Sequence, residues 1–186
     1  MSGMRGRRRK RGMTNTDLDP CAVARRSVAI MATGTFADFE EVVHPAAHNR
    51  EDVDEPPASR GRGPAAFYAT ALWLRAAYSD LKWEEHDAVQ DGDLVVMHVT
   101  MSGRHTGTFV AYGPDARPVQ AFPATGRTFA TTQSHWLRIA DGKVIEHWAN
   151  RDDLGTATPL GWTPPSPRYL ARMILATRRA KRAAGR

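Results

Sequence analysis

Residues 134–155 read SHWLRIADGKVIEHWANRDDLG, and this stretch decides the fold. Asp141-Gly142 stands between two runs rich in β-branched and aromatic residues, which is the typical signal of a two-residue hairpin turn. In such a hairpin Ala140 faces Lys143, and pairing continues one residue for one residue away from the turn. The sequence therefore predicts two long antiparallel strands joined at Asp141-Gly142.

This register also predicts which side chains share a face, because side chains along a strand alternate between the two faces of a sheet. One face collects a cluster that is unusually polar for a buried strand pair: Gln133, His135, Trp148, Asn150 and Asp152. A bulge of one residue would shift the pairing and reverse the assignment.

The rest of the chain divides into a helical part and a strand part. Helical periodicity and start signals predict helices over 21–31, 35–43 and 64–78, separated by a Pro- and charge-rich loop over 44–63. Alternation then predicts strands over 81–89 and 94–102, followed by the 128–151 hairpin. Helices followed by an antiparallel sheet indicate an α+β fold.

Charge is distributed unevenly along the 186 residues, although the net charge is +6. Residues 1–12 contain six Lys or Arg and residues 168–186 contain seven, with no acidic residue in either segment. We therefore expect a basic, disordered tail over 1–18, a folded domain over 19–162 and a basic extension over 163–186 whose pattern is compatible with a helix. Basic excess confined to the ends makes nucleic-acid binding unlikely, since a nucleic-acid reader needs its positive patch on the folded surface.

Composition excludes several further classes of protein. No apolar run approaches the ~18 residues of a membrane span, and no signal core follows the basic start, so we expect a cytoplasmic protein without a membrane partner. Cys21 is the only cysteine, which precludes an intrachain disulfide. The sequence has seven histidines but neither an HxH nor an HExxH motif, so we predict no metal site.

The chain resembles the SnoaL-like polyketide cyclase family of the nuclear-transport-factor-2-like superfamily over about residues 20–161. The resemblance rests on HPAAHNR, AAYSDLKW, QDGDLVV, SGRHTG, ADGKVIEHWANRDDLG and a closing PLG. It implies a cone-shaped α+β barrel, in which a strongly curved antiparallel sheet wraps around the N-terminal helices and leaves an apolar pocket. It also implies a homodimer or higher homo-oligomer formed through the outer face of the sheet.

The same resemblance suggests roles for individual residues. The family's acid/base carboxylate maps onto Asp152 by its spacing from Trp148, and an apolar pocket would raise the pKa of such a group toward neutrality. His135 would be the oxyanion donor or second proton carrier, while His48, Gln133, Asn150 and Trp148 would bind substrate. The alternatives are that Asp152 caps the turn after its strand and that Trp148 belongs to the core.

These features lead to a functional hypothesis: a cofactor-free acid/base enzyme that acts on a small hydrophobic or aromatic polyketide. The expected reaction is ring closure by aldol attack. Isomerisation, dehydration, epoxide opening and cofactor-independent oxygenation remain alternatives, because a fold does not fix a reaction. A non-catalytic protein that binds a small hydrophobic compound is a further alternative.

Overall fold

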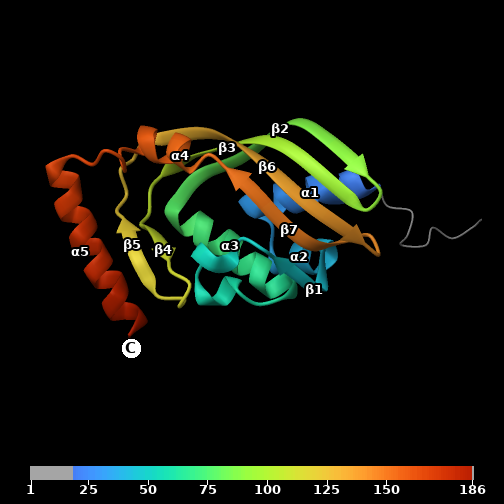
Figure 1. The fold of residues 1–186 in the computed structure, drawn as a ribbon, viewed down its shortest axis with the longest axis horizontal. Coiled ribbons are helices and arrows are strands. Elements are labelled where there is room, and N and C mark those ends of the chain that lie inside the picture. Colours follow the sequence, from blue (N-terminus) through green and yellow to red (C-terminus); the bar gives the residue numbers. More distant parts are fainter. Residues whose placement is uncertain (1–18, 186) are drawn as a thin grey trace, which may run out of the picture.

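The computed structural model describes residues 19–185, which form a mixed α+β fold as the sequence predicts (Figure 1). The helices are α1 (Pro20–Thr33), α2 (Phe36–Val42), α3 (Gly63–Ala77), α4 (Asp153–Leu160) and α5 (Pro167–Ala184), with short 3-10 turns η2 (Asp52–Asp54) and η3 (Pro57–Ser59). The strands are β1 (Val43–Asn49), β2 (Tyr78–Asp91), β3 (Leu94–His105), β4 (Phe109–Tyr112), β5 (Pro118–Phe122), β6 (Thr128–Ala140) and β7 (Lys143–Arg151). The predicted tail over 1–18 lies outside the described residues.

The main sheet has the strand order β1-β7-β6-β3-β2 and is curved but not closed. Its long antiparallel strands arch over α1 and α3, while the smaller β4-β5 sheet stands beside them (Figure 1). β1 pairs with β7 in parallel, although the sequence predicts a loop at this position. The correction has a physical reason: Pro45 weakens the local strand signal, and a strand at the edge of a sheet tolerates proline.

The hairpin register departs from the prediction at one place. Ala140 pairs with Lys143 and Ile139 with Val144, but Arg138 then pairs with Glu146, so Ile145 is an extra residue on β7. Such a bulge shifts every later pair by one residue and exchanges the two faces. Beyond Ile145 the inward positions are therefore held by the residues that the predicted register places on the opposite face from Gln133 and His135: His147, Ala149 and Arg151.

The core lies between the concave face of the main sheet and the helices. One cluster joins α1 and α2 to the strands and includes Phe39, Val99 and Leu137; a second includes Tyr78, Phe129 and Trp162 near α4 and α5. The cavity described below opens where these two clusters meet.

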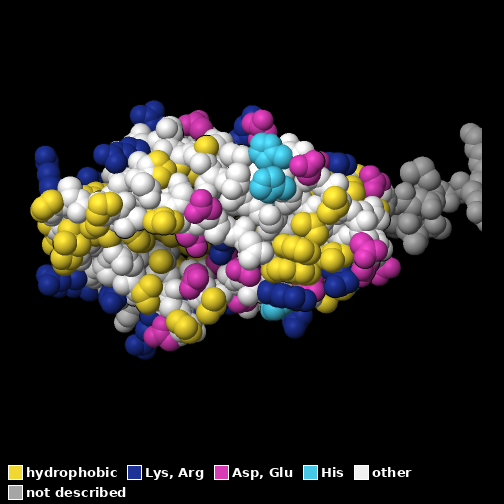
Figure 2. All heavy atoms as spheres, turned by 45° about the horizontal axis from the view of Figure 1, so that its top comes forward, with side chains coloured by type: hydrophobic (Ala, Val, Ile, Leu, Met, Phe, Trp, Pro, Cys, Tyr) yellow, Lys and Arg dark blue, Asp and Glu magenta, His cyan; other side chains and the backbone are white. Residues whose placement is uncertain are grey.

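The basic C-terminal extension contains the helix α5, which packs against β5. The Tyr169 hydroxyl donates to the Pro123 carbonyl oxygen at 2.9 Å, and the Ala121 backbone N–H donates to Thr177 Oγ1 at 2.9 Å. Its outer side exposes Leu170, Ile174 and Leu175, and Figure 2 shows hydrophobic side chains gathered at this end of the molecule. Among the helices within residues 19–185, none has the length and apolar character needed to cross a membrane.

Candidate active site

A cavity of about 500 Å³ lies between the concave face of the main sheet, α1, α3, α4 and the β4-β5 sheet. This volume is within the usual range for sites that enclose a drug-sized ligand. Polar side chains gather on the wall formed by β1, β6 and β7, and aromatic side chains gather at the opposite end. We refer to these two regions as the polar wall and the aromatic end.

The aromatic end is built from rings contributed by α3, the start of β2, the β4-β5 sheet and the segment after α4: Trp73, Tyr78, Phe109, Phe122 and Trp162. The Phe122 and Trp162 rings stack with centroids 4.2 Å apart, and the Phe109 and Trp162 centroids are 5.3 Å apart. Trp73 Nε1 donates to the Val110 carbonyl oxygen at 3.0 Å, which fixes its ring. Such an arrangement favours a flat, conjugated ligand, because aromatic rings prefer offset-stacked contacts.

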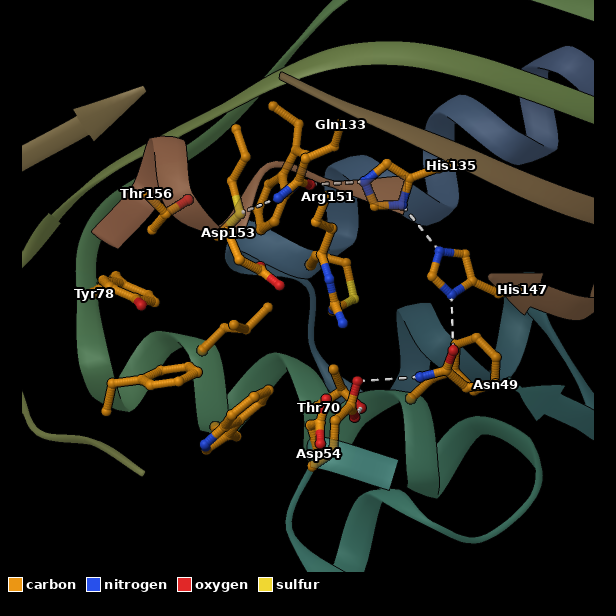
Figure 3. Close-up of a pocket in the computed structure, with 18 of the residues that line it drawn as sticks. Asn49, Asp54, Thr70, Tyr78, Gln133, His135, His147, Arg151, Asp153 and Thr156 are labelled. Carbon is orange, nitrogen blue, oxygen red and sulfur yellow. Dashed lines mark hydrogen bonds between the residues drawn. The ribbon is translucent and has the colours of Figure 1, made fainter. Parts of the chain in front are cut away.

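The polar wall contains a continuous chain of hydrogen-bonded side chains (Figure 3). Gln133 Oε1 lies 2.9 Å from His135 Nε2, His135 Nδ1 lies 2.9 Å from His147 Nε2, and His147 Nδ1 lies 3.0 Å from Asn49 Oδ1. Asn49 Nδ2 then donates to Glu55 Oε1 at 3.1 Å. We call this set of five residues the polar chain.

The bulge at Ile145 brings the polar chain together, since it turns His147 toward His135 on the neighbouring strand. The parallel pairing of β1 with β7 places Asn49 opposite His147. Burial lowers the pKa of His135 to about 4, with a smaller contribution from the Arg151 charge. Burial, His135 and Arg151 together lower the pKa of His147 well below its usual range. Both imidazoles are therefore neutral near neutral pH.

Glu55 ends the polar chain as a carboxyl group that is only 2% exposed. Burial raises its pKa, while hydrogen bonds from Thr70 and Asn49 and the Arg151 charge act in the opposite direction. A buried carboxyl with hydrogen-bond partners on both oxygens is held in a fixed orientation. Glu55 therefore anchors the far end of the chain.

Two charged residues at the end of β7 face the same cavity. The Arg151 guanidinium and the Asp153 carboxylate both point into it (Figure 3). Asp153 is the first residue of α4. The pKa of Tyr78, which lines the same cavity, is raised by burial of its phenol and by the negative charge of Asp153. Arg151 also approaches Glu51, with Nη2 3.8 Å from the carboxylate. The cavity thus holds a carboxylate and a cation within one polar region.

The structure places the predicted site residues in two groups. Gln133 and His135 line the cavity, whereas the other four do not: His48, Trp148, Asn150 and Asp152. Asp152 is exposed and caps α4, since its carboxylate accepts from the Gly155 backbone N–H at 2.7 Å. The prediction that Asp152 lies on the inner wall is wrong, because the bulge reverses the faces and the strand ends at Arg151.

The bulge also turns Trp148 and Asn150 away from the cavity, and the strand β1 keeps His48 outside it. Asn150 is exposed, and Trp148 stacks on Trp136 with centroids 5.9 Å apart while the Arg50 guanidinium lies 4.2 Å from its ring centroid. His48 is on β1 next to Asn49 and does not line the cavity.

Among the residues that line the cavity and were not predicted as site residues, five belong to the polar chain or carry charge beside it: Asn49, Glu55, His147, Arg151 and Asp153. His147 and Arg151 face the cavity because of the bulge, and Asp153 does so because β7 ends at Arg151. Asn49 and Glu55 reach the cavity from the unpredicted strand β1 and the turn after it. Among residues 19–185, no group of three or more His, Cys, Asp or Glu side chains is placed to hold a metal ion.

A curved antiparallel sheet packed on helices, around an aromatic cavity that also holds a carboxylate, a cation and paired imidazoles, is typical of a small-molecule enzyme. Residues 22–160 match the SnoaL-like polyketide cyclase family. The protein belongs to this family and is an enzyme of the SnoaL-like cyclase type.

The relatives agree with this assignment. The chain is 35% identical over 146 residues to the aklanonic acid methyl ester cyclase DnrD of Streptomyces peucetius, covering 78% of this chain and 92% of the relative. It is 31% identical over 135 residues to the nogalonic acid methyl ester cyclase of Streptomyces nogalater, covering 72% and 91%. The solved structure of TsrD from Streptomyces laurentii is similar with a TM-score of 0.62 and 25% identity, covering 78% and 98%.

Proposed function

We propose that this protein closes a ring in a polycyclic polyketide ester by intramolecular aldol addition, using only its own side chains. The observation that carries the proposal is the division of one cavity into an aromatic end and a polar wall that holds Asp153, Arg151 and Gln133. The ester is inferred from two relatives, which are methyl ester cyclases by name.

Asp153 is the proposed acid and base. Its carboxylate removes a proton from the carbon next to a substrate carbonyl, which leaves an enolate. The enolate carbon attacks a second carbonyl of the same molecule, so one C–C bond forms and the attacked oxygen becomes an alkoxide. The proton held by Asp153 returns to this alkoxide, and substrate and product have the same composition.

Arg151 and Gln133 are the proposed partners for substrate oxygens. Arg151 brings a positive charge to the cavity, where it can pair with the negative charge of a developing enolate. Gln133 is buried, and its amide contacts His135 on one side and lines the cavity on the other, so it can hydrogen-bond a substrate oxygen. The predicted roles of His135 and Gln133 thus continue in the proposal, with His135 acting through Gln133.

The aromatic end supplies positioning. A flexible chain attached to a ring system has many conformations, and only a few bring the enolate carbon near its carbonyl. Holding the substrate rings against the stacked side chains of Phe109, Phe122 and Trp162 removes this entropic cost before the chemical step. Substrate shape would therefore be read at the aromatic end and chemistry performed at the polar wall.

The proposal is tested with aklanonic acid methyl ester and nogalonic acid methyl ester, the compounds in the relatives' names. Each ester is incubated with the protein and a metal chelator, without added cofactor, and products are separated by liquid chromatography with mass detection. We expect a new product of unchanged mass from at least one ester. Saturable binding of both esters without any conversion would support a non-catalytic binding protein instead.

We further propose that two copies associate through the outer face of the main sheet. The half-exposed Trp136 and Trp148 lie on this face of β6 and β7 and support the proposal. Light scattering after gel filtration should then give twice the mass of one chain, and a single-chain mass would contradict it. The cytoplasmic location stays a prediction.

A further inference from the structure

The polar chain requires a definite number of protons. Three of its hydrogen bonds involve imidazole nitrogens: Gln133 Oε1 with His135 Nε2, His135 Nδ1 with His147 Nε2, and His147 Nδ1 with Asn49 Oδ1. Each bond needs one N–H, because both amide oxygens are acceptors. Two neutral imidazoles carry only two N–H groups. The arrangement in which Gln133 Oε1 faces His135 is therefore that of a pair with three protons and one positive charge.

The Asn49 end of the chain cannot turn over. Asn49 Oδ1 also accepts from the Glu51 backbone N–H at 3.2 Å, and Asn49 Nδ2 donates to Glu55 Oε1 at 3.1 Å. A reversed amide would set its NH2 group against the Glu51 N–H and its oxygen against the Glu55 carboxyl. His147 therefore keeps its proton on Nδ1.

The Gln133 end of the chain can turn over. Its amide nitrogen has a single partner among the described residues, Met101 Sδ at 3.3 Å, and a thioether is a weak acceptor. If the pair loses its third proton, His135 donates from Nδ1 to His147 and its Nε2 becomes an acceptor. Gln133 then satisfies Nε2 by turning its NH2 group toward His135, which exchanges one weak contact for a full hydrogen bond.

We propose that the His135–His147 pair and the Gln133 amide form one coupled switch. With two ring protons, Gln133 presents its carbonyl oxygen to the cavity and accepts from a substrate hydroxyl. With three ring protons, Gln133 presents its N–H and donates to a substrate oxygen. Asn49 and Glu55 are positioning residues, since they fix the far end so that any change in protonation appears at Gln133. The link to substrate rests on the proposed function.

The surroundings of the pair set the pH range of the switch. Its charged neighbours along the cavity are Arg151 and Asp153 on the β7 side and Asp54 and Glu55 beyond β1, while α3 presents the uncharged Phe67. Burial and Arg151 keep the pKa of His135 at about 4, so the two-proton form prevails near neutral pH. A negative charge on a substrate oxygen bound next to Gln133 stabilises the positive charge of the three-proton pair. It therefore favours the state in which Gln133 presents its N–H to the cavity.

The switch is tested first in the wild-type protein without ligand. Nitrogen-15 NMR of histidine-labelled protein reports which ring nitrogen carries each proton as pH is varied. At pH 7 we expect both His135 and His147 to carry their proton on Nδ1, and at lower pH we expect the pair to take up one proton as a unit. A proton on Nε2 of His135 at pH 7 would overturn the proposal.

Two variants then separate hydrogen bonding from charge. Gln133→Glu and Asn49→Asp each add one carboxylate to one end of the polar chain, but only Gln133→Glu removes the donor that the neutral pair requires. In the Gln133→Glu variant the imidazole pair should therefore hold three ring protons at pH 7. The pH at which half of the molecules have lost the third proton should be at least about one unit higher than in Asn49→Asp. Equal midpoints in the two variants would overturn the proposal.

The matched surface control is Gln90→Glu. Gln90 is exposed on β2, so this substitution adds the same charge at a site away from the polar chain. Its ring protonation should equal that of the wild type. If a substitution in the polar chain prevents folding, the wild-type measurement still decides. Since no step uses substrate, a failure of ring closure would not affect these results, and a failure of the switch would leave the cyclase proposal standing.

Discussion

The polar wall and the aromatic end of the cavity are built by different physical means. In the polar wall, the five residues of the polar chain are held one by the next through hydrogen bonds of 2.9 to 3.1 Å. At the aromatic end, rings pack at centroid distances of 4.2 to 5.7 Å with several interplanar angles. Hydrogen bonds are directional, whereas apolar packing is not.

The difference teaches how one cavity can fix a reaction and still accept different ring systems. Changing one residue of the polar wall leaves a buried partner unsatisfied, which costs about 1–3 kcal/mol or more. Changing an aromatic residue alters volume, and volume-conserving changes usually cost less than about 1.5 kcal/mol. We therefore expect the polar wall to determine turnover and the aromatic end to determine which substrate is bound.

The largest expected effect is that of Asp153→Asn on turnover. Removal of the proposed base should lower kcat by about 10²- to 10⁴-fold, because general acid–base catalysis contributes this much. Substrate affinity, measured by fluorescence titration, should stay within about threefold, because the amide keeps the shape of the carboxylate and the aromatic end is unchanged.

Asp152→Asn is the matched control, since it makes the same change one residue earlier on an exposed helix cap. Asparagine is as good a cap as aspartate, so both kcat and stability should stay close to the wild type. If Asp152→Asn lost turnover and Asp153→Asn did not, the carboxylate suggested by the family spacing would regain its role.

The second effect concerns the aromatic end. Trp162→Ala should reduce the free energy of unfolding by about 3–5 kcal/mol, because a buried ring stacked on Phe109 and Phe122 is removed. In the milder variant Trp162→Phe, KM should rise with little change in kcat. A loss of kcat at unchanged KM would show that the two ends of the cavity do not divide the work as proposed.

The third effect is acid sensitivity of the fold. Because His135 has a pKa of about 4 when folded and about 6.5 when unfolded, the unfolded state binds the proton more readily between these values. Stability should be fully present above pH 6.5 and fall by up to about 1.4 kcal/mol for each pH unit below it. Urea unfolding of the wild type and of His135→Gln checks this, and the variant should show a smaller slope over the same range.

The smallest effect is expected on the outer face of the sheet. Arg50→Ala removes a guanidinium above the Trp148 ring and an exposed ion pair with Glu146. Each is worth about 0.5–1 kcal/mol at an exposed site, so the melting temperature should fall by a few degrees while kcat and KM stay unchanged. An effect on kcat would connect the outer face to the cavity.

The sequence alone was sufficient for the hairpin, for most of the helices and for the α+β class, because these depend on local turn chemistry and periodicity. Asp141-Gly142 lies at the turn with positive φ angles at both residues, as the two-residue loop requires. The face of each residue on β7 could not be predicted, since Ile145 is an ordinary strand residue and nothing marks it as a bulge. The strand β1 was missed because its partner β7 is about 100 residues away and pairing of this kind leaves no local pattern.

The candidate site divides in the same way. Gln133 and His135 lie on β6, which has no extra residue. Their inward position was therefore predictable from alternation relative to the core. His147 and Arg151 follow the bulge on β7 and Asp153 begins α4, so alternation without a bulge did not place these three residues in the cavity. Asn49 and Glu55 depend on β1 and the turn after it, where proline and clustered charge suggested only a loop.

Because of the single extra residue at Ile145, the number of residues in this hairpin determines which side chains line the cavity, just as their identity does. Deletion of one residue there would restore simple alternation and turn Trp148 and Asn150 inward, exchanging a whole wall in one genetic event. Among related chains, insertions and deletions near this turn would thus be a route by which new pocket chemistry arises without any point mutation.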